Sequence, residues 1–366
     1  MGIDLGSVEL YLGPTVLGGP DDLDAVVRTF IAGAKRKLYI AVQELDSRPI
    51  AEAVINAKAA KVQVRLITEG DYLVESPPIA DPWSGGGDYE TNRTIHAALL
   101  RSGVDVITDL NANFFHQKFI VRDPGEPTAA VLTGSSNFTL TDTGRNPPDN
   151  PGQRGNNLNN VLVLHGQTIA RQYLAEFERL RSGTFGDLHE RVEPRPDEFR
   201  LAKIRVKPLF APRHGPEMEI MKQMLKAATS IDFAVFTFSQ SSGIDDTMFR
   251  LVGSLGRLRG VLDRQQGVQK WAATEGLKAA GVQLFQNKPG TGVRKLHHKL
   301  MVIDERLVIA GSMNYTGPAS TLNDENIIVL GDLEETDPDA ETAQRLLAGH
   351  VLTEIDRIIT ELAEPV

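Results

Sequence analysis

The chain has 366 residues, of which 41% are hydrophobic and 24% are charged, and its formal net charge at pH 7 is -9. These values are ordinary for a soluble globular protein, and the length suits two domains or one duplicated unit. The absence of cysteine excludes thiol catalysis, thiolate metal sites and disulfides. No apolar run approaches the roughly 20 residues of a membrane span, and no signal peptide is visible, so we expect a cytoplasmic protein.

The expected helices and strands recur in the same order in two parts of the chain. The first part has strands at 8–14, 38–45, 61–68 and 103–110, with helices at about 21–36, 48–60 and 92–102. The second part has strands at 207–212, 231–238, 259–264 and 281–287, with helices at about 215–228, 241–256 and 267–280. Such alternation predicts a mostly parallel or mixed sheet with helices on both faces.

A repeat of about half the chain predicts two pseudo-symmetric halves and not a solenoid. A charged segment with two prolines, 184–203, follows an expected helix at 168–183. We place the boundary there, which gives halves at 1–190 and 191–366. The first half carries two long loops, 72–90 and 141–157, and loops of this length are usually functional or disordered. The acidic segment 332–341 is expected to precede and open the last helix, because acids suit its N-terminal dipole.

Each half then delivers the same set of polar residues. The sequence from 116 reads HQKFIVRDPGEPTAAVLTGSSN, and the sequence from 297 reads HHKLMVIDERLVIAGSMN. The shared residues are His116, Lys118, Asp123, Ser135 and Asn137 in the first half, and His297, Lys299, Asp304, Ser312 and Asn314 in the second. Residues i and i+2 of a strand point to one face, so each imidazole and ammonium should be presented together. A single His-x-Lys pair is usually a solvated strand edge, but two copies of the whole pattern indicate one duplicated site.

These residue types suit displacement at a phosphodiester. A neutral imidazole can attack phosphorus and form a phosphohistidine, while a second, protonated imidazole donates to the leaving oxygen. Lysine and asparagine side chains can hold the phosphoryl oxygens, as a metal would elsewhere. No metal and no cofactor is expected, because lysine is not a usual ligand, cysteine is absent and no His-x3-His pair occurs.

The two motifs resemble those of the phospholipase D superfamily, and most closely its bacterial nuclease and cardiolipin-hydrolase branch. The resemblance covers essentially the whole chain and is looser in the first copy, where the extra PGEP lengthens a hairpin. It implies an α/β fold of two α-β-α sandwich halves, each a mixed sheet flanked by helices, with the active site at their interface. It also implies a metal-independent mechanism with these roles: His116 and His297 as nucleophile and general acid, Lys118, Lys299, Asn137 and Asn314 as phosphate ligands, Glu325 as a residue that orients a histidine, and Asp123 and Asp304 as structural acids.

One position breaks the symmetry of the two copies. Glu325 in the second half aligns with Asn159 in the first, so only one histidine gains a carboxylate partner of this kind. A carboxylate favours the imidazolium form. Because Glu325 lies in the same half as His297, we predict that it contacts His297, which would make His297 the general acid and His116 the nucleophile.

The motifs indicate that a phosphodiester bond is cleaved, but they determine less well which molecule carries that bond. The net charge argues against nucleic acid, but segment 286–300 carries four basic residues and no acid, and Arg154 follows the first motif. We therefore expect a nuclease acting on DNA or RNA, with Phe114, Phe115, Phe138 and Tyr315 as possible stacking residues, although aromatics beside strands are more often core.

The alternative is a phospholipase D that hydrolyses a phospholipid of the phosphatidylcholine or cardiolipin type to phosphatidic acid. The loop around Trp83 could supply the apolar entry surface that this reading needs. A degenerate scaffold that only binds phosphate is disfavoured, because both copies keep histidine and lysine. Each chain supplies both motifs, so a monomer is expected.

Overall fold

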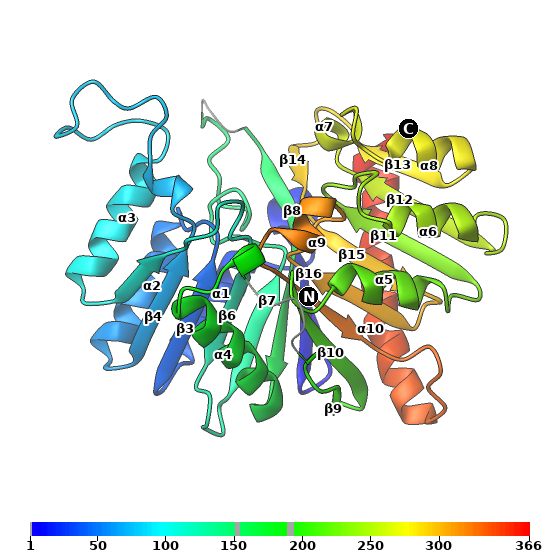
Figure 1. The fold of residues 1–366 in the computed structure, drawn as a ribbon, viewed down its shortest axis with the longest axis horizontal. Coiled ribbons are helices and arrows are strands. Elements are labelled where there is room, and N and C mark those ends of the chain that lie inside the picture. The colour runs from blue at the N-terminus through cyan, green and yellow to red at the C-terminus, as the bar shows by residue number, and fades with distance from the viewer. Residues whose placement is uncertain (1, 151–153, 189–193) are drawn as a thin grey trace.

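The computed structural model describes residues 2–150, 154–188 and 194–366, and it contains two mixed β-sheets side by side (Figure 1). The first sheet has the strand order β1-β2-β8-β7-β6-β3-β4-β5, with β14 paired to β8. The second has the order β18-β13-β12-β11-β15-β16-β17-β10-β9. We call the elements from β1 to α4 the first half and those from β9 to β18 the second half. The predicted α/β fold with two mixed sheets flanked by helices is confirmed.

The elements of the first half are β1 (Ile3–Asp4), β2 (Val8–Gly13), α1 (Leu23–Ala32), β3 (Lys37–Val42), α2 (Arg48–Ala59), β4 (Gln63–Thr68), α3 (Glu90–Arg101), β5 (Asp105–Thr108), β6 (Lys118–Arg122), β7 (Ala130–Gly134), β8 (Asn156–His165) and α4 (Gln167–Arg181). The elements of the second half are β9 (Phe199–Leu201), β10 (Ile204–Ala211), α5 (Pro216–Met224), β11 (Ser230–Val235), α6 (Ile244–Leu251), β12 (Arg257–Leu262), α7 (Arg264–Gly267), α8 (Thr274–Ala280), β13 (Gln283–Asn287), β14 (Val293–Leu296), β15 (Lys299–Ile303), β16 (Leu307–Gly311), α9 (Gly317–Thr321), β17 (Glu325–Leu330), α10 (Pro338–Arg357) and β18 (Ala363–Pro365).

The two halves repeat one topology. The spatial order β2-β8-β7-β6-β3-β4-β5 corresponds to β10-β17-β16-β15-β11-β12-β13, and the parallel and antiparallel pairings match strand by strand. The predicted order of elements is confirmed for all the strands named from the sequence. The predicted boundary between 190 and 191 lies among residues 189–193, outside the described residues.

Helices cover both faces of each sheet. The faces that the two sheets turn toward each other share one apolar core with α4 and α10, through residues such as Tyr173 and Phe177 on α4 and Leu347 and Val351 on α10. Separate apolar clusters pack α1, α2 and α3 on the far face of the first sheet, and α5, α6 and α8 on the far face of the second. Because both faces are covered, the central strands are nearly continuous apolar runs. None of the helices in the described ranges is both long and apolar enough to cross a membrane.

Two local features differ from the sequence predictions, and a third agrees with them. The helix expected over 267–280 is two short helices, α7 and α8, separated by an irregular segment, 268–273. Strand β14 was not predicted. It lies in the basic segment 286–300, and its pairing is with β8 of the other half, which the segment's own sequence does not indicate. The last helix begins where expected, and Asp337 caps it by accepting hydrogen bonds from the backbone of Asp339 and Ala340.

The aspartates of the two motifs hold neighbouring strands together. Asp123 follows β6 and accepts hydrogen bonds from the backbone N–H groups of residues 35, 36 and 37 at 2.7–2.9 Å, just where β3 begins. Asp304 follows β15 and accepts from residues 228, 229 and 230 at 2.8–2.9 Å, where β11 begins. Both aspartates have left-handed backbone conformations, with φ of 49° and 52°. These contacts explain why an aspartate stands five residues after each motif lysine.

We predict that Asp123→Ala lowers the free energy of unfolding by about 3 kcal/mol, because it removes the buried carboxylate that accepts three backbone hydrogen bonds. Asp123→Asn is the matched control and should cost less, since it keeps one oxygen and tolerates the left-handed backbone. Urea titration measures both. A loss in Asp123→Ala no larger than that in Asp123→Asn would contradict this account.

The same contact predicts a pH dependence. Burial raises the pKa of Asp123, but its backbone hydrogen bonds outweigh this and hold the pKa below the usual value. A lowered native pKa contributes stability that is present above the pKa of the unfolded chain and is lost as pH falls through the native value. Asp123→Asn should therefore lose less stability than the wild type when urea titrations are repeated at decreasing acidic pH.

Candidate active site

The segments that carry the two motif histidines are held by backbone hydrogen bonds that cross between the halves. The N–H of His116 donates to the carbonyl of Asp324 at 3.0 Å, and Phe115 pairs with Asp324 in a parallel bridge. The N–H of His297 donates to the carbonyl of Leu158 at 2.9 Å, and β14 pairs in parallel with the start of β8. Each histidine therefore precedes its own strand, β6 or β15, and lies beside the start of a strand of the other half, β17 or β8.

This crossing corrects the predicted pairing of Glu325. The Nδ1 atom of His116 lies 2.7 Å from Oε2 of Glu325. The Nδ1 atom of His297 lies 2.9 Å from Oδ1 of Asn159. The prediction that Glu325 contacts His297 is wrong, because β17 delivers its first residue to the histidine segment of the first half. Glu325 does contact a motif histidine, but across the interface.

The motif serines extend each contact by one residue. Ser312 donates to Oε2 of Glu325 at 2.6 Å, and Ser135 donates to Oδ1 of Asn159 at 2.8 Å. Each serine oxygen also accepts a hydrogen bond from the backbone N–H of the next strand residue, at position 326 or 160. Two matching chains result, Ser–Glu–His and Ser–Asn–His, and all of their side chains are buried. They fix the direction of both imidazole rings.

The two motif lysines are buried beside the histidines. Lys118 donates to the carbonyl of His116 at 2.9 Å and to Gln43 at 3.2 Å, and Lys299 donates to the carbonyl of His297 at 2.8 Å. Burial lowers the pKa of Lys118 to about 8. Burial, and then the charge of Lys118, lowers the pKa of Lys299 well below its usual value. Two ammonium groups held out of water in this way gain stability from a bound anion.

The motif asparagines face a pocket with unused polar atoms. Asn137 and Asn314 both line the pocket that contains the histidines. Their Oδ1 atoms are buried and have no hydrogen-bond partner among the described residues. Buried polar atoms normally have a partner, so an unpaired amide oxygen at each symmetry-related position indicates that these side chains meet a ligand.

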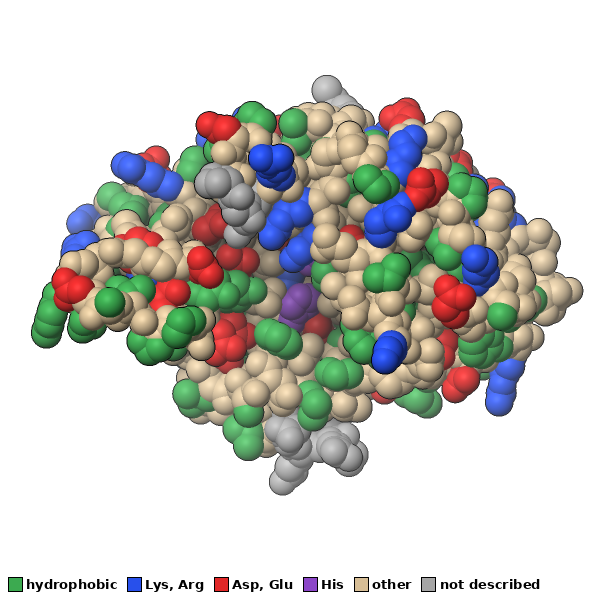
Figure 2. Space-filling view, turned by 90° about the horizontal axis from the view of Figure 1, so that it is seen from above, with side chains coloured by type: hydrophobic (Ala, Val, Ile, Leu, Met, Phe, Trp, Pro, Cys, Tyr) green, Lys and Arg blue, Asp and Glu red, His purple; other side chains and the backbone are tan. Residues whose placement is uncertain are grey.

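The pocket lies between the halves and has a volume of about 540 Å³. His116 and His297 both line it, with Arg294 and Lys295 from β14, and with Glu44 and Asp142 among the residues from the first half. Figure 2 looks into this hollow and shows a histidine inside it, with basic side chains bordering one side and acidic side chains on another. Burial, and then the charges of Asp46 and Asp142, raises the pKa of Glu44 to about 8. The lining is therefore of mixed charge and not uniformly basic.

Burial dominates the electrostatics of the paired histidines. It lowers the pKa of His116, and the charges of Lys118 and Lys299 lower it further. It lowers the pKa of His297 in the same way, with Lys299 and Lys295 as the next causes. Burial also raises the pKa of Glu325 to about 8. Burial and the neighbouring lysines therefore favour neutral imidazoles, and a phosphodiester, which brings one negative charge, would favour protonation of one of them.

Some pocket residues were missed by the sequence reasoning. Asp142 accepts a hydrogen bond from the backbone of Asn137 at 2.7 Å, and its Oδ2 lies 3.9 Å from Nδ1 of His297. Tyr72 and Tyr89, at the two ends of loop 72–90, also line the pocket. The only indication of these residues in the sequence was the unusual length of loops 72–90 and 141–157, in which they lie. Residues 151–153 of the second loop lie outside the described residues.

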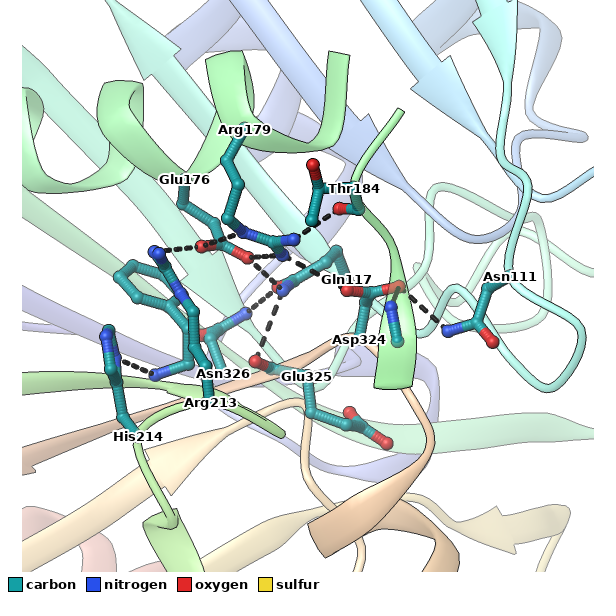
Figure 3. A network of polar contacts seen from close by, with 12 residues as sticks. Asn111, Gln117, Glu176, Arg179, Thr184, Arg213, His214, Asp324, Glu325 and Asn326 are labelled. Carbon is teal, nitrogen blue, oxygen red and sulfur yellow. Dashed lines mark hydrogen bonds and ion pairs between the residues drawn. The ribbon is translucent and has the colours of Figure 1, made fainter. Parts of the chain in front are cut away.

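A buried network of charged side chains lies next to Gln117 and Asp324 (Figure 3). Glu176 of α4 forms ion pairs with Arg179 at 2.6 Å and Arg213 at 2.5 Å, and Arg179 also contacts Asp324 at 3.1 Å. Gln117, the residue between the motif histidine and lysine, donates to the carbonyl of Glu325 at 3.2 Å. The network thus braces the backbone on both sides of the Glu325–His116 contact.

No group of three or more histidine, aspartate or glutamate side chains that could hold a metal ion occurs within the described ranges. Phe115, Phe138 and Tyr315 are buried core residues, so they are not available to stack bases, whereas Phe114 is 51% exposed and lines the pocket.

Comparison with known proteins agrees with the motifs. The family model described as "Cardiolipin synthase, PLD-like domain" matches residues 27–181 and 220–346. A mitochondrial cardiolipin hydrolase of Chlamydomonas reinhardtii is 33% identical over 106 residues, which cover 29% of this chain and 46% of that protein. A phospholipase D of Rickettsia conorii is 31% identical over 140 residues, which cover 37% of this chain and 65% of that protein. The chain thus spans only about half to two thirds of these relatives.

A crystal structure of phosphatidylserine synthase from Haemophilus influenzae has the same fold, with a TM-score of 0.66 and 12% identity over 100% of this chain and 89% of that one. The preference for nucleic acid that we drew from the sequence is contradicted by the relatives, which are named for phospholipase D and cardiolipin hydrolase activities.

We predict that Asn159→Asp raises the pKa of His297 by about one to two units, because it places a carboxylate where a neutral amide now contacts Nδ1. Titration of ¹⁵N-histidine resonances by NMR measures this. The resonances of His298, which is buried but contacts Asn160 instead, serve as the internal control. An unchanged His297 in a folded Asn159→Asp protein would contradict the observed contact.

Proposed function

The chain belongs to the phospholipase D superfamily, and we propose that it is a phosphodiesterase that hydrolyses phospholipids at the pocket between its halves. The observation that carries this proposal is the pair His116 and His297 in one pocket, each with Nδ1 engaged by a residue of the opposite half. With Nδ1 engaged, Nε2 is the nitrogen of each ring that remains for chemistry.

We assign the nucleophile to His116. When Nε2 of an imidazole bonds to phosphorus, the ring gains positive charge, and a carboxylate on Nδ1–H stabilises that charge. Glu325 supplies this carboxylate to His116. The sequence analysis also predicted His116 as the nucleophile, but it did so by placing Glu325 on His297. In the structure Glu325 contacts His116, so the carboxylate now supports the nucleophile and not the general acid.

His297 then serves as the general acid. Its Nδ1 partner is the neutral amide of Asn159, which stabilises an imidazolium less than a carboxylate does. A protonated His297 therefore gives up its proton more readily to the leaving oxygen as the P–O bond breaks. In the second step His297 takes a proton from water, which attacks the phosphohistidine, and His116 leaves as the neutral imidazole.

The remaining motif residues stabilise the phosphoryl group in this proposal. The ammonium groups of Lys118 and Lys299 supply positive charge, and the side-chain Nδ2–H groups of Asn137 and Asn314, two residues that line the pocket, donate hydrogen bonds to its oxygens. Because these groups are fixed and buried before the substrate arrives, little reorganisation is needed as charge develops.

Two observations support a phospholipid over a nucleic acid. The relatives are named phospholipase D and cardiolipin hydrolase. The pocket wall also carries Glu44 and Asp142 as well as Arg294 and Lys295, so it is not the continuous basic groove that tracks a chain of phosphates. A single phosphodiester does not need such a groove.

The activity test uses phosphatidylcholine and cardiolipin vesicles in the presence of EDTA. We predict release of phosphatidic acid, and a loss of about 10³-fold or more in both His116→Ala and His297→Ala. Asn160→Ala, which changes a buried residue next to Asn159, is a control for folding. Full activity in either histidine variant would contradict one shared site, and cleavage of single-stranded DNA without any lipid hydrolysis would contradict the substrate class.

The division of labour has a separate test. Rapid acid-free quenching with a phospholipid labelled in its phosphate should trap a phosphorylated enzyme, and peptide mapping should place the adduct on His116. In Asn314→Ala the adduct should form more slowly but on the same residue. An adduct on His297 would reverse the assignment of nucleophile and acid.

A further inference from the structure

Both tryptophans of the chain are exposed, and both lie in loops that border the pocket. Trp83 is 95% exposed in loop 72–90, whose two ends supply Tyr72 and Tyr89 to the pocket wall. Trp271 is 45% exposed in segment 268–273, which follows α7 and its pocket residue Gln266. Large aromatic side chains normally bury 150–250 Å² in a folded protein, so two exposed tryptophans beside one pocket need a reason.

Each tryptophan has an exposed aliphatic companion. Val74 near the start of the first loop is 65% exposed, and Val268 directly after α7 is 71% exposed. Loop 72–90 and α7 rise at the same edge of the molecule, on either side of β14 (Figure 1). The segments that carry these apolar groups therefore lie on opposite sides of β14, whose Arg294 and Lys295 line the pocket.

The tryptophan loop of the first half has a firm base. Arg93 of α3 forms ion pairs with Glu75 at 2.8 Å and with Glu90 of the same helix at 3.1 Å, so the start of the loop is tied to the helix that follows it. The rings of Tyr72 and Tyr89 meet edge to face with centroids 5.4 Å apart. These contacts hold Trp83 outward from the body of the protein.

The charges between the two tryptophan loops suit phosphate head groups. Arg294 and Lys295 of β14 both line the pocket, and the ammonium of Lys295 lies 5.4 Å from the ring centroid of Phe236. Lys270 is exposed next to Trp271. Tryptophan is the residue enriched at the boundary between water and hydrocarbon, because its ring is apolar and its indole N–H donates a hydrogen bond.

We propose that this edge of the molecule docks on a phospholipid bilayer, with Trp83 and Trp271 in the interfacial layer and β14 over the head groups. The inference rests on the proposed function, since it takes the substrate to be a lipid presented in a membrane. It goes further in naming the surface that meets the membrane. A bound bilayer would place a lipid phosphodiester between Arg294, Lys295 and the paired histidines.

Intrinsic fluorescence reads this surface directly, because the chain contains no tryptophan other than Trp83 and Trp271. With the full chain and phosphatidylcholine vesicles, we expect a blue shift of tryptophan emission and quenching by lipids brominated near the head group.

Trp83→Ala and Trp271→Ala each leave one tryptophan as the reporter, and the emission of that remaining tryptophan should still shift. In the double variant, co-sedimentation with vesicles should fall by at least about tenfold. Met218→Ala, which removes an exposed apolar side chain on α5, is the matched control and should bind as the wild type does.

A short-chain phospholipid kept below its aggregation concentration separates the two proposals. Equal hydrolysis of this monomeric lipid by the wild type and the double variant, with vesicle hydrolysis lost only in the variant, would support docking. If tryptophan emission does not change on addition of vesicles while monomeric lipid is hydrolysed, the docking surface is overturned and the proposed function stands. Emission that shifts with vesicles when no lipid is hydrolysed would support docking and overturn the proposed function. A shift that follows protein concentration without vesicles would overturn docking in favour of self-association.

Discussion

The candidate site depends on backbone hydrogen bonds that cross between the two halves, from His116 to Asp324 and from His297 to Leu158. A strand paired to its neighbour has a fixed register, and a shift of one residue would turn its side chains to the opposite face. The register of these crossings therefore decides that Glu325 meets His116 and that Asn159 meets His297. Each histidine is oriented by the half that does not contain it, so neither half alone holds a complete arrangement.

Burial gives this arrangement its chemical character. Lys118, Lys299 and Glu325 are ionisable groups kept away from water, and burial shifts the pKa of each toward its neutral form. Placing such groups inside a protein costs stability unless neighbours compensate. The ion network around Glu176 and Arg179 lies beside the site and stiffens the backbone that carries Glu325. Burial of these groups destabilises the folded protein, and packing elsewhere in the fold must offset that loss. Binding of an anionic substrate would offset part of it.

Much of the fold and of the site could be predicted from the sequence, because the evidence was local. The motif residues stand at fixed spacings, and the apolar strands and the repeat follow from short windows. The partner of Glu325 could not be predicted, because His116 and His297 have the same local context and the choice depends on pairing between distant segments. Strand β14 was missed for the same reason, since its hydrogen bonds lie in the other half. Asp142 lies in the long loop 141–157, and the course of that loop brings it to the site. The course of such a loop cannot be predicted from its composition.

The exchange of partners between the halves also bears on how such a protein can diverge. In a homodimer of identical subunits, twofold symmetry would place the same side chain beside both histidines. Joining the two copies in one chain removes that constraint, so that glutamate occupies one position and asparagine the other. A duplicated gene can therefore turn two equivalent histidines into an unequal pair by a single substitution. Because both halves belong to one chain, each copy of the motif can change independently of the other.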